Sequence, residues 1–212
     1  MNFPAEPTLF DAAPIALDHA AAVARLRAAL DAAFDKCTMP AAPSRCPRFT
    51  NTMRTALTQA LADPALVTAA EREGCPETYR RHLIVADPQG RYTVAALVWQ
   101  PGHASPVHAH HTWCGYAVLE GTLTETLYVW DETRGAADAV RAHPRTPGAV
   151  SFGGPGRHAI HRLSNESGKR AVSLHVYGVH ATQIGTHVND VLPLYVAPLA
   201  NCHTGTPGVN SD

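Results

Sequence analysis

The hydrophobic pattern divides the chain into a helical first third and a strand-rich remainder. Residues 16–36 are rich in alanine and leucine and contain neither glycine nor proline. The larger apolar residues that recur there at intervals of three or four are Val23, Leu26, Leu30 and Phe34. This spacing predicts a helix, for which Asp18 is expected to be the N-cap. Prolines at positions 40, 43 and 47 indicate a loop, and two shorter helices are predicted over residues 50–61 and 64–72.

From residue 79 onward the chain consists of short runs of β-branched and aromatic residues separated by glycine and proline. The runs are HLIVAD, RYTVAALVW, CGYAVLEGTLTETLYVW, GAVSFG and AVSLHVYGV. Many short strands joined by turns are typical of an antiparallel sandwich or barrel. We therefore expect a mainly β fold. A helical segment at residues 1–75 would pack outside a barrel or jelly roll at residues 76–200, and a polar, glycine-rich tail would occupy residues 201–212.

The composition argues against several classes of protein. Lys and Arg number 17 against 18 Asp and Glu, so no basic excess indicates nucleic-acid binding or a membrane anchor. No apolar run approaches the roughly 20 residues of a spanning helix, and the first 14 residues are acidic, unlike a secretory signal. The five cysteines form no CxxC pair, which favours reduced thiols. We expect a cytoplasmic protein that is a monomer or weak homo-oligomer, with neither nucleic acid nor membrane as partner.

Two histidines carry the first indication of chemistry, among 13 in the chain. His108 and His110 are two residues apart, so a strand would place both imidazoles on one face, close enough to share a metal ion. His161 follows some fifty residues later, after a glycine-rich turn, and Asn165 comes four residues after it. Three imidazoles leave other coordination positions open and suit Fe(II), Zn(II), Cu(II) or Ni(II) alike.

Glycines at fixed distances make this arrangement similar to the two-part motif of the cupin superfamily. Gly102 lies six residues before His108 and Gly121 eleven after His110, as in Gly-x5-His-x-His-x3-(Glu)-x6-Gly. Cys114 stands where many cupins place a metal-binding glutamate.

Three further histidines are alternatives or neighbours of these ligands. His103 and His158 could each be structural or lie beside the metal ligands. His111 would point to the opposite face of the strand from His110.

The segment from Tyr79 to Tyr177 resembles the thiol dioxygenases, the cysteine dioxygenase family of cupins, in a bacterial form. The matching stretches are YRRHL from Tyr79, HAH from His108, Cys114, GTLTETL from Gly121, HRLSN from His161 and SLHVY from Ser173. The resemblance implies a cupin barrel that uses Fe(II) and O2 to convert a small thiol to its sulfinic acid. It implies that His108, His110 and His161 bind the iron.

The resemblance also implies roles for the residues around the metal. Arg81 would hold the substrate carboxylate, with Tyr79 as its neighbour. Ser173, His175 and Tyr177 would form a hydrogen-bonded relay beside the iron. Cys114 matches a cysteine that, in some members, forms a thioether cross-link to the tyrosine, here Tyr177.

The substrate is the least determined part of the hypothesis. Arg81 favours L-cysteine, whereas Trp113 and the bacterial spacing also fit homologues that act on 3-mercaptopropionate. Mercaptosuccinate would need another cation for its second carboxylate, for which Arg80, His103 and Arg157 are candidates. A non-enzymatic cupin that binds a metal or small molecule, or a zinc or nickel cupin enzyme, are hypotheses of other classes.

Overall fold

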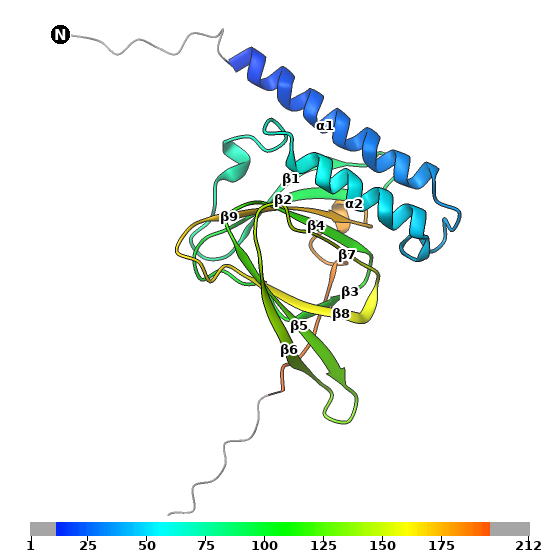
Figure 1. Ribbon diagram of the computed structural model, residues 1–212, viewed down its shortest axis with the longest axis vertical. Coiled ribbons are helices and arrows are strands. Elements are labelled where there is room, and N and C mark those ends of the chain that lie inside the picture. The colour runs from blue at the N-terminus through cyan, green and yellow to red at the C-terminus, as the bar shows by residue number, and fades with distance from the viewer. Residues whose placement is uncertain (1–11, 196–212) are drawn as a thin grey trace, which may run out of the picture.

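Two antiparallel five-stranded sheets face each other in the computed structural model, which describes residues 12–195 (Figure 1). The first sheet has the order β1 (Arg80–Ala86), β2 (Thr93–Trp99), β9 (Ala171–Tyr177), β4 (Cys114–Glu120), β7 (Val150–Gly153). The second has the order β10 (Asn189–Val191), β3 (His108–His110), β8 (Gly156–Ser164), β5 (Leu123–Asp131), β6 (Ala136–Arg145). The expected mainly β jelly roll is confirmed, and the predicted tail at 201–212 lies outside the described residues.

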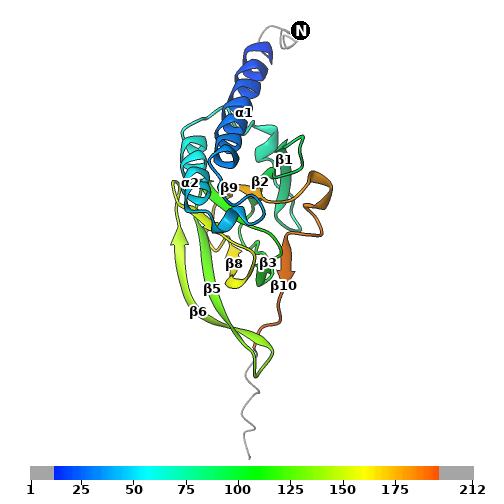
Figure 2. The ribbon, with the colours of Figure 1, turned by 90° about the vertical axis from the view of Figure 1, so that its right-hand side faces the viewer.

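Helices α1 (Ala12–Asp35) and α2 (Pro47–Leu61) pack together against the first sheet, as expected (Figure 2). Phe49 of α2 is fully buried, and its ring meets the Trp113 ring with centroids 5.3 Å apart. Leu57 of the same helix is 1% exposed in the same apolar cluster. Burial of each such side chain contributes about 1.5–3 kcal/mol, so the helices close the outer face of the sheet that carries β9.

An ion-pair cluster fixes α1 to the barrel. Arg91 hydrogen-bonds Asp31 of α1 and, through Nε at 2.6 Å, the buried carboxylate of Asp87. Burial alone raises the pKa of Asp87, but the hydrogen bonds from Arg91 outweigh burial and leave this pKa below its usual value. The Asp87 charge is therefore stabilised in the folded protein. No helix of the described chain has the length and apolar character that crossing a membrane requires.

The helix boundaries correct three predictions. Helix α1 begins at Ala12, so Asp18 lies inside it and is not its N-cap. Helix α2 begins at Pro47, because proline is well tolerated at the first helical position. The helix predicted over residues 64–72 is wrong: only a 3-10 turn, η2 (Ala70–Arg72), forms there. Thr68 and Glu71 each accept a hydrogen bond from the other's backbone N–H and so form a capping box, but Glu73 is already extended, so only one turn forms before Gly74 and Pro76.

The barrel contains strands that the hydrophobic runs did not identify, β6 and β10 among them. The long run at residues 114–130 is also split into β4 and β5 at Gly121. Gly121 has φ +71, and a Cβ there would lie 2.5 Å from the Arg170 carbonyl oxygen. Only glycine fits this turn without strain.

Candidate metal centre

Strands β3 and β8 bring the three predicted histidines together. His108 and His161 are direct partners in the antiparallel pair, and His110 lies on the same face of β3 as His108. Each offers a ring nitrogen, and these nitrogens all lie within 4.8 Å of one another. All three side chains are buried. We call these residues the three-histidine cluster.

Hydrogen bonds orient two of these imidazoles. The Nδ1 of His108 is 2.9 Å from the Pro106 carbonyl oxygen, which can only accept, so His108 donates from Nδ1. The Nδ1 of His161 is 2.8 Å from Oε1 of Glu125. Both contacts leave Nε2 with a free lone pair, as a metal ligand requires. Burial lowers the pKa of His108 to about 4 and that of His110 further, so both are neutral near pH 7.

Glu125 is a site residue that the sequence analysis missed. Its side chain is buried on β5, where it also lies 3.3 Å from His143 and 3.6 Å from Arg145. Burial raises its pKa, but the hydrogen bond from His161 and the charge of Arg145 act against burial, and the net pKa lies below its usual value. The sequence does contain a pattern that could have identified it. Glu125 is two residues from both Leu123 and Leu127, so it lies with them on the inward face of β5. A charged residue at an inward position requires buried partners.

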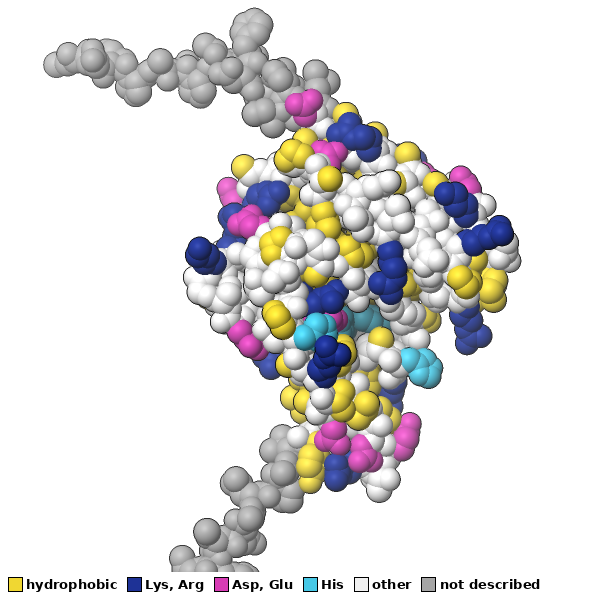
Figure 3. Space-filling model, viewed as in Figure 1, with side chains coloured by type: hydrophobic (Ala, Val, Ile, Leu, Met, Phe, Trp, Pro, Cys, Tyr) yellow, Lys and Arg dark blue, Asp and Glu magenta, His cyan; other side chains and the backbone are white. Residues whose placement is uncertain are grey.

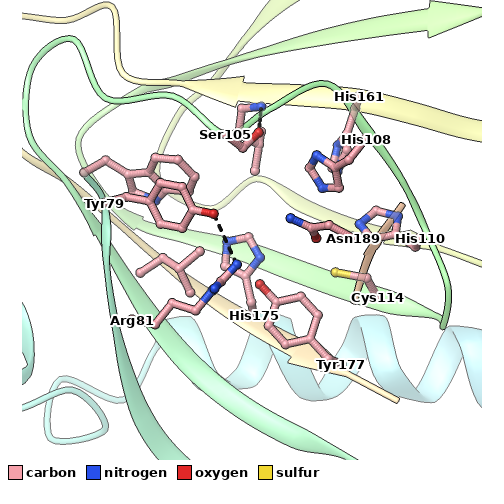
Figure 4. Close-up of a pocket in the computed structure, with 13 residues that line it drawn as sticks. Tyr79, Arg81, Ser105, His108, His110, Cys114, His161, His175, Tyr177 and Asn189 are labelled. Carbon is pink, nitrogen blue, oxygen red and sulfur yellow. Dashed lines mark hydrogen bonds between the residues drawn. The ribbon is translucent and has the colours of Figure 1, made fainter. Parts of the chain in front are cut away.

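Arg81 and Tyr79 line a pocket beside the cluster (Figure 4). A terminal nitrogen of Arg81 donates to the Tyr79 hydroxyl at 3.1 Å, and the Tyr79 ring stacks on Trp99. The Nε of Arg81 is buried and has no hydrogen-bond partner among residues 12–195. Arg80, by contrast, is exposed, as the alternation along β1 predicts. The pocket therefore contains a positioned guanidinium with an unused donor.

Ser173 and His175 of β9 form a buried hydrogen-bonded pair, and Tyr177 lies next along the same face. Trp99 Nε1 donates to the Ser173 oxygen at 2.9 Å, and that oxygen lies 2.8 Å from His175 Nε2. The Ser173 hydroxyl can therefore donate to His175, which favours the His175 tautomer with its proton on Nδ1. The rings of His175 and Tyr177 stack with centroids 5.7 Å apart. Burial raises the pKa of Tyr177 and lowers that of His175, so both are neutral.

Cys114 is directly opposite Tyr177 in the pairing of β4 with β9. Both side chains are buried in one apolar cluster, and both are directed into the pocket (Figure 4). Burial raises the pKa of the Cys114 thiol, so it is protonated in the folded protein. The two residues of the predicted cross-link are thus neighbours.

The sequence of the β-rich part of the chain matches a known protein family. The family model described as cysteine dioxygenase type I matches residues 75–188, more than half of the chain. The chain belongs to the cysteine dioxygenase family. Every residue predicted for the site, from Tyr79 to Tyr177, falls within the matched range.

Curated relatives match over a shorter part of the chain. Human cysteine dioxygenase type 1 is 30% identical over 103 residues, which are 47% of this chain and 50% of the human protein. The rat enzyme of the same name is 31% identical over 104 residues, with the same coverage of both chains. The chain thus spans about half the length of the curated relatives that it matches.

Solved structures match this cysteine dioxygenase family member at low identity. A protein from Thermus thermophilus has a TM-score of 0.40 and 24% identity, covering 50% of this chain and 89% of that one. An oxalate oxidase has a TM-score of 0.39 and 13% identity, covering 50% of this chain and 53% of that one.

The remaining histidines and cations of this cysteine dioxygenase family member lie elsewhere. His103 accepts a hydrogen bond from the Gln100 backbone N–H at 3.0 Å and contacts the Pro76 carbonyl, so it stabilises a turn. His111 and His158 are exposed and outside the three-histidine cluster. Arg157 stacks over Trp130. Of the Lys and Arg side chains in the described part of the chain, Arg81 alone lines the pocket.

Asn189 is a second residue that the sequence analysis missed. It belongs to β10 and pairs with His110, and its amide is directed into the pocket (Figure 4). Strand β10 has only three residues, so no hydrophobic alternation in the sequence marks it.

Proposed function

We propose that this chain is a non-haem Fe(II) thiol dioxygenase that converts a small carboxylated thiol, L-cysteine by preference, to its sulfinic acid with O2. The supporting observation is the unpartnered guanidinium nitrogen of Arg81 in the pocket that the three-histidine cluster also lines. A metal site and a carboxylate-binding group share one small pocket, and a thiol acid has one functional group for each.

The donor set of the cluster fits a ferrous ion. His108, His110 and His161 offer three ring nitrogens that are mutually close, and the first two are held neutral by burial. Neutral imidazoles leave the charge of a divalent ion unbalanced, so the set suits an anionic sulfur ligand. An iron ion bound here would supply the place where the thiol sulfur and dioxygen meet.

Arg81 selects for a carboxylate on the substrate. Its planar guanidinium can form a charge-assisted bidentate pair, which is stronger than a neutral hydrogen bond. Because no second Lys or Arg of the described chain lines the pocket, thiols with one carboxylate are favoured over mercaptosuccinate. The Asn189 amide oxygen can accept a hydrogen bond from an ammonium group, which favours L-cysteine over 3-mercaptopropionate.

Tyr177, His175 and Ser173 order the polar side of the pocket. The protonated phenol of Tyr177 can donate a hydrogen bond to substrate or oxygen, and the buried Ser173–His175 pair keeps the neighbouring ring in place. A thioether between Cys114 and Tyr177 would further restrict the phenol, which preorganises the site.

Oxygen uptake by the iron-loaded protein tests this proposal. L-cysteine is expected to give the highest kcat/KM, above 3-mercaptopropionate and mercaptosuccinate, and labelled O2 should place both of its oxygen atoms in the sulfinate. A higher kcat/KM for either alternative would change the assigned substrate but not the assignment as a thiol dioxygenase. Absence of uptake with all three thiols would refute the dioxygenase assignment, and zinc or nickel in protein purified without added metal would favour another class.

The role of Arg81 is tested by Arg81→Gln, with Arg80→Gln as the exposed control on the same strand. A desolvated charge pair is worth about 2–5 kcal/mol, so kcat/KM for L-cysteine should fall about 30-fold or more in R81Q. R80Q should stay near the parent value. Turnover of cysteamine, which lacks a carboxylate, as efficient as that of L-cysteine would contradict this role.

A further inference from the structure

A second cavity reaches the three-histidine cluster from the other side of the sandwich. Strand order places β1 and β10 at one end of the two sheets and β7 and β6 at the other. The Arg81 pocket lies at the first end, whereas this cavity, of about 450 Å³, is lined by residues 151–153 of β7 and by alternate residues of β6. Figure 3 shows a hollow where histidine and basic side chains gather. We call it the β6–β7 cavity.

Unpartnered polar atoms concentrate in this cavity. Among the described residues, seven buried side-chain nitrogen or oxygen atoms lack a hydrogen-bond partner. Four of them belong to residues that line it: His110 Nδ1, Tyr116 Oη, His143 Nδ1 and Arg145 Nε. Tyr116 is 2% exposed, so its hydroxyl belongs to the wall of the cavity and not to the protein surface. Buried polar groups are nearly always hydrogen-bonded in folded proteins, so this cluster indicates that a polar ligand belongs there.

The charged side chains that line the cavity indicate that this ligand is an anion. Arg141, His143 and Arg145 alternate along β6 and therefore share its inward face, opposite Leu127, Glu125 and Leu123 of β5. Glu125 is the one carboxylate among the lining residues, and it hydrogen-bonds His161. Two guanidinium groups against one carboxylate give the lining a positive net charge before any histidine is protonated.

We propose that the β6–β7 cavity is a second binding site, distinct from the Arg81 pocket, for a small oxyanion such as a carboxylate or sulfinate. Arg141 and Arg145 would supply charge-assisted hydrogen bonds, and the Tyr116 hydroxyl would donate another. The side chains of His110 and His161 line the inner end of the cavity, so the anion would lie behind the metal ligands. The proposal does not depend on dioxygenase activity, although a sulfinate is what that reaction would release.

Calorimetric titration of the full-length protein with methanesulfinate and with acetate tests the site. Binding in the millimolar range is expected, and it should persist within about twofold after a chelator removes the metal. Tighter binding of L-cysteine sulfinate than of acetate would identify a reaction product as the natural anion, whereas equal binding would identify a general carboxylate site. Absence of binding for all three anions would overturn the proposal.

Variants distinguish this cavity from the Arg81 pocket. Arg141→Gln is the main test because Arg141 is exposed and forms no ion pair with another described residue, so the fold should tolerate the change. Both R141Q and Arg145→Gln should weaken anion binding about tenfold or more, and Tyr116→Phe less. Arg134→Gln, an exposed arginine of the same hairpin, should leave it unchanged, and R81Q should leave unchanged the part of the binding that R141Q weakens. Loss of binding in R81Q or on metal removal, with R141Q unaffected, would place the anion at the metal centre and refute the proposal.

Discussion

The contact between Glu125 and His161 leads to a quantitative prediction for metal affinity. The carboxylate oxygen lies 2.8 Å from His161 Nδ1, and both residues are buried. A hydrogen bond to a charged group contributes about 1.5–3 kcal/mol, and its loss releases the imidazole from the tautomer that binds a metal. Glu125→Ala should therefore lower the affinity for a divalent metal by about 10- to 100-fold, the range found for such outer partners.

Glu125→Gln separates the two contributions of the carboxylate. The amide oxygen can still accept from His161 Nδ1, but the negative charge is lost, so the affinity of this variant should lie between those of the parent and the alanine variant. Glu120→Gln is the matched control, since Glu120 pairs with Arg72 and Arg170 away from the three-histidine cluster. It should bind metal like the parent protein.

Competition with a chelating dye for Co(II) and, without oxygen, for Fe(II) measures these affinities directly. Circular dichroism must show that the variants are folded, because removal of Glu125 leaves Arg145 and His143 without their carboxylate. An affinity within about threefold of the parent for folded E125A would refute the reasoning, since that change is smaller than the contribution of a single buried charged hydrogen bond. An equal loss in E120Q would also refute it.

Three further predictions follow from the same geometry. His161→Ala should abolish iron retention, whereas His158→Ala, at an exposed position, should retain iron. Metal analysis that shows the reverse would identify His158 as the third ligand in place of His161. Turnover with iron, substrate and O2, which is the oxidant, should reduce the intact mass by two hydrogens through a thioether between Cys114 and Tyr177. A Cys114 that stays fully alkylatable in active enzyme would exclude the bond. Asp87→Asn should lower the free energy of unfolding at pH 7 by about 1–3 kcal/mol in urea titrations. Because the folded pKa of Asp87 is depressed, its contribution is present above the unfolded value, about 3.9, and is lost as the pH falls through the folded pKa. The stability difference between parent and variant should therefore narrow in acid, and a constant difference would contradict the assignment.

Local patterns in the sequence were sufficient for the barrel and for the approach of the three histidines. His108 and His110 are two apart, which fixes both on one face of any strand, and the cupin spacing identifies His161 as their partner. The alternation of Ser173, His175 and Tyr177 similarly places three side chains on one face of β9. Period-two arrangements survive errors in strand boundaries, because they depend on relative position alone.

Features that depend on long-range pairing could not be predicted in the same way. Glu125 reaches His161 because β5 pairs with β8, and Asn189 reaches the pocket because β10 pairs with β3. Neither pairing has a signal within its own segment. The false helix at residues 64–72 has a local cause, since the Thr68–Glu71 capping box starts a helical turn but the chain is already extended at Glu73, just before Gly74 and Pro76.

The distribution of charge around the three-histidine cluster indicates that its two sides bind different groups. On the β1 side, Arg81 has an unpartnered donor and no carboxylate among the described lining residues, so an incoming carboxylate completes the pair. On the β6 side, Glu125 already balances part of the charge of Arg145 and orients His161. An anion there adds to an existing network of side chains behind the metal ligands and does not need the metal for its binding. Because the two sides share only residues of the cluster and Cys114, substitutions at Arg81 and Arg141 should act independently, and non-additive effects of the double variant on anion binding would show that the sides communicate.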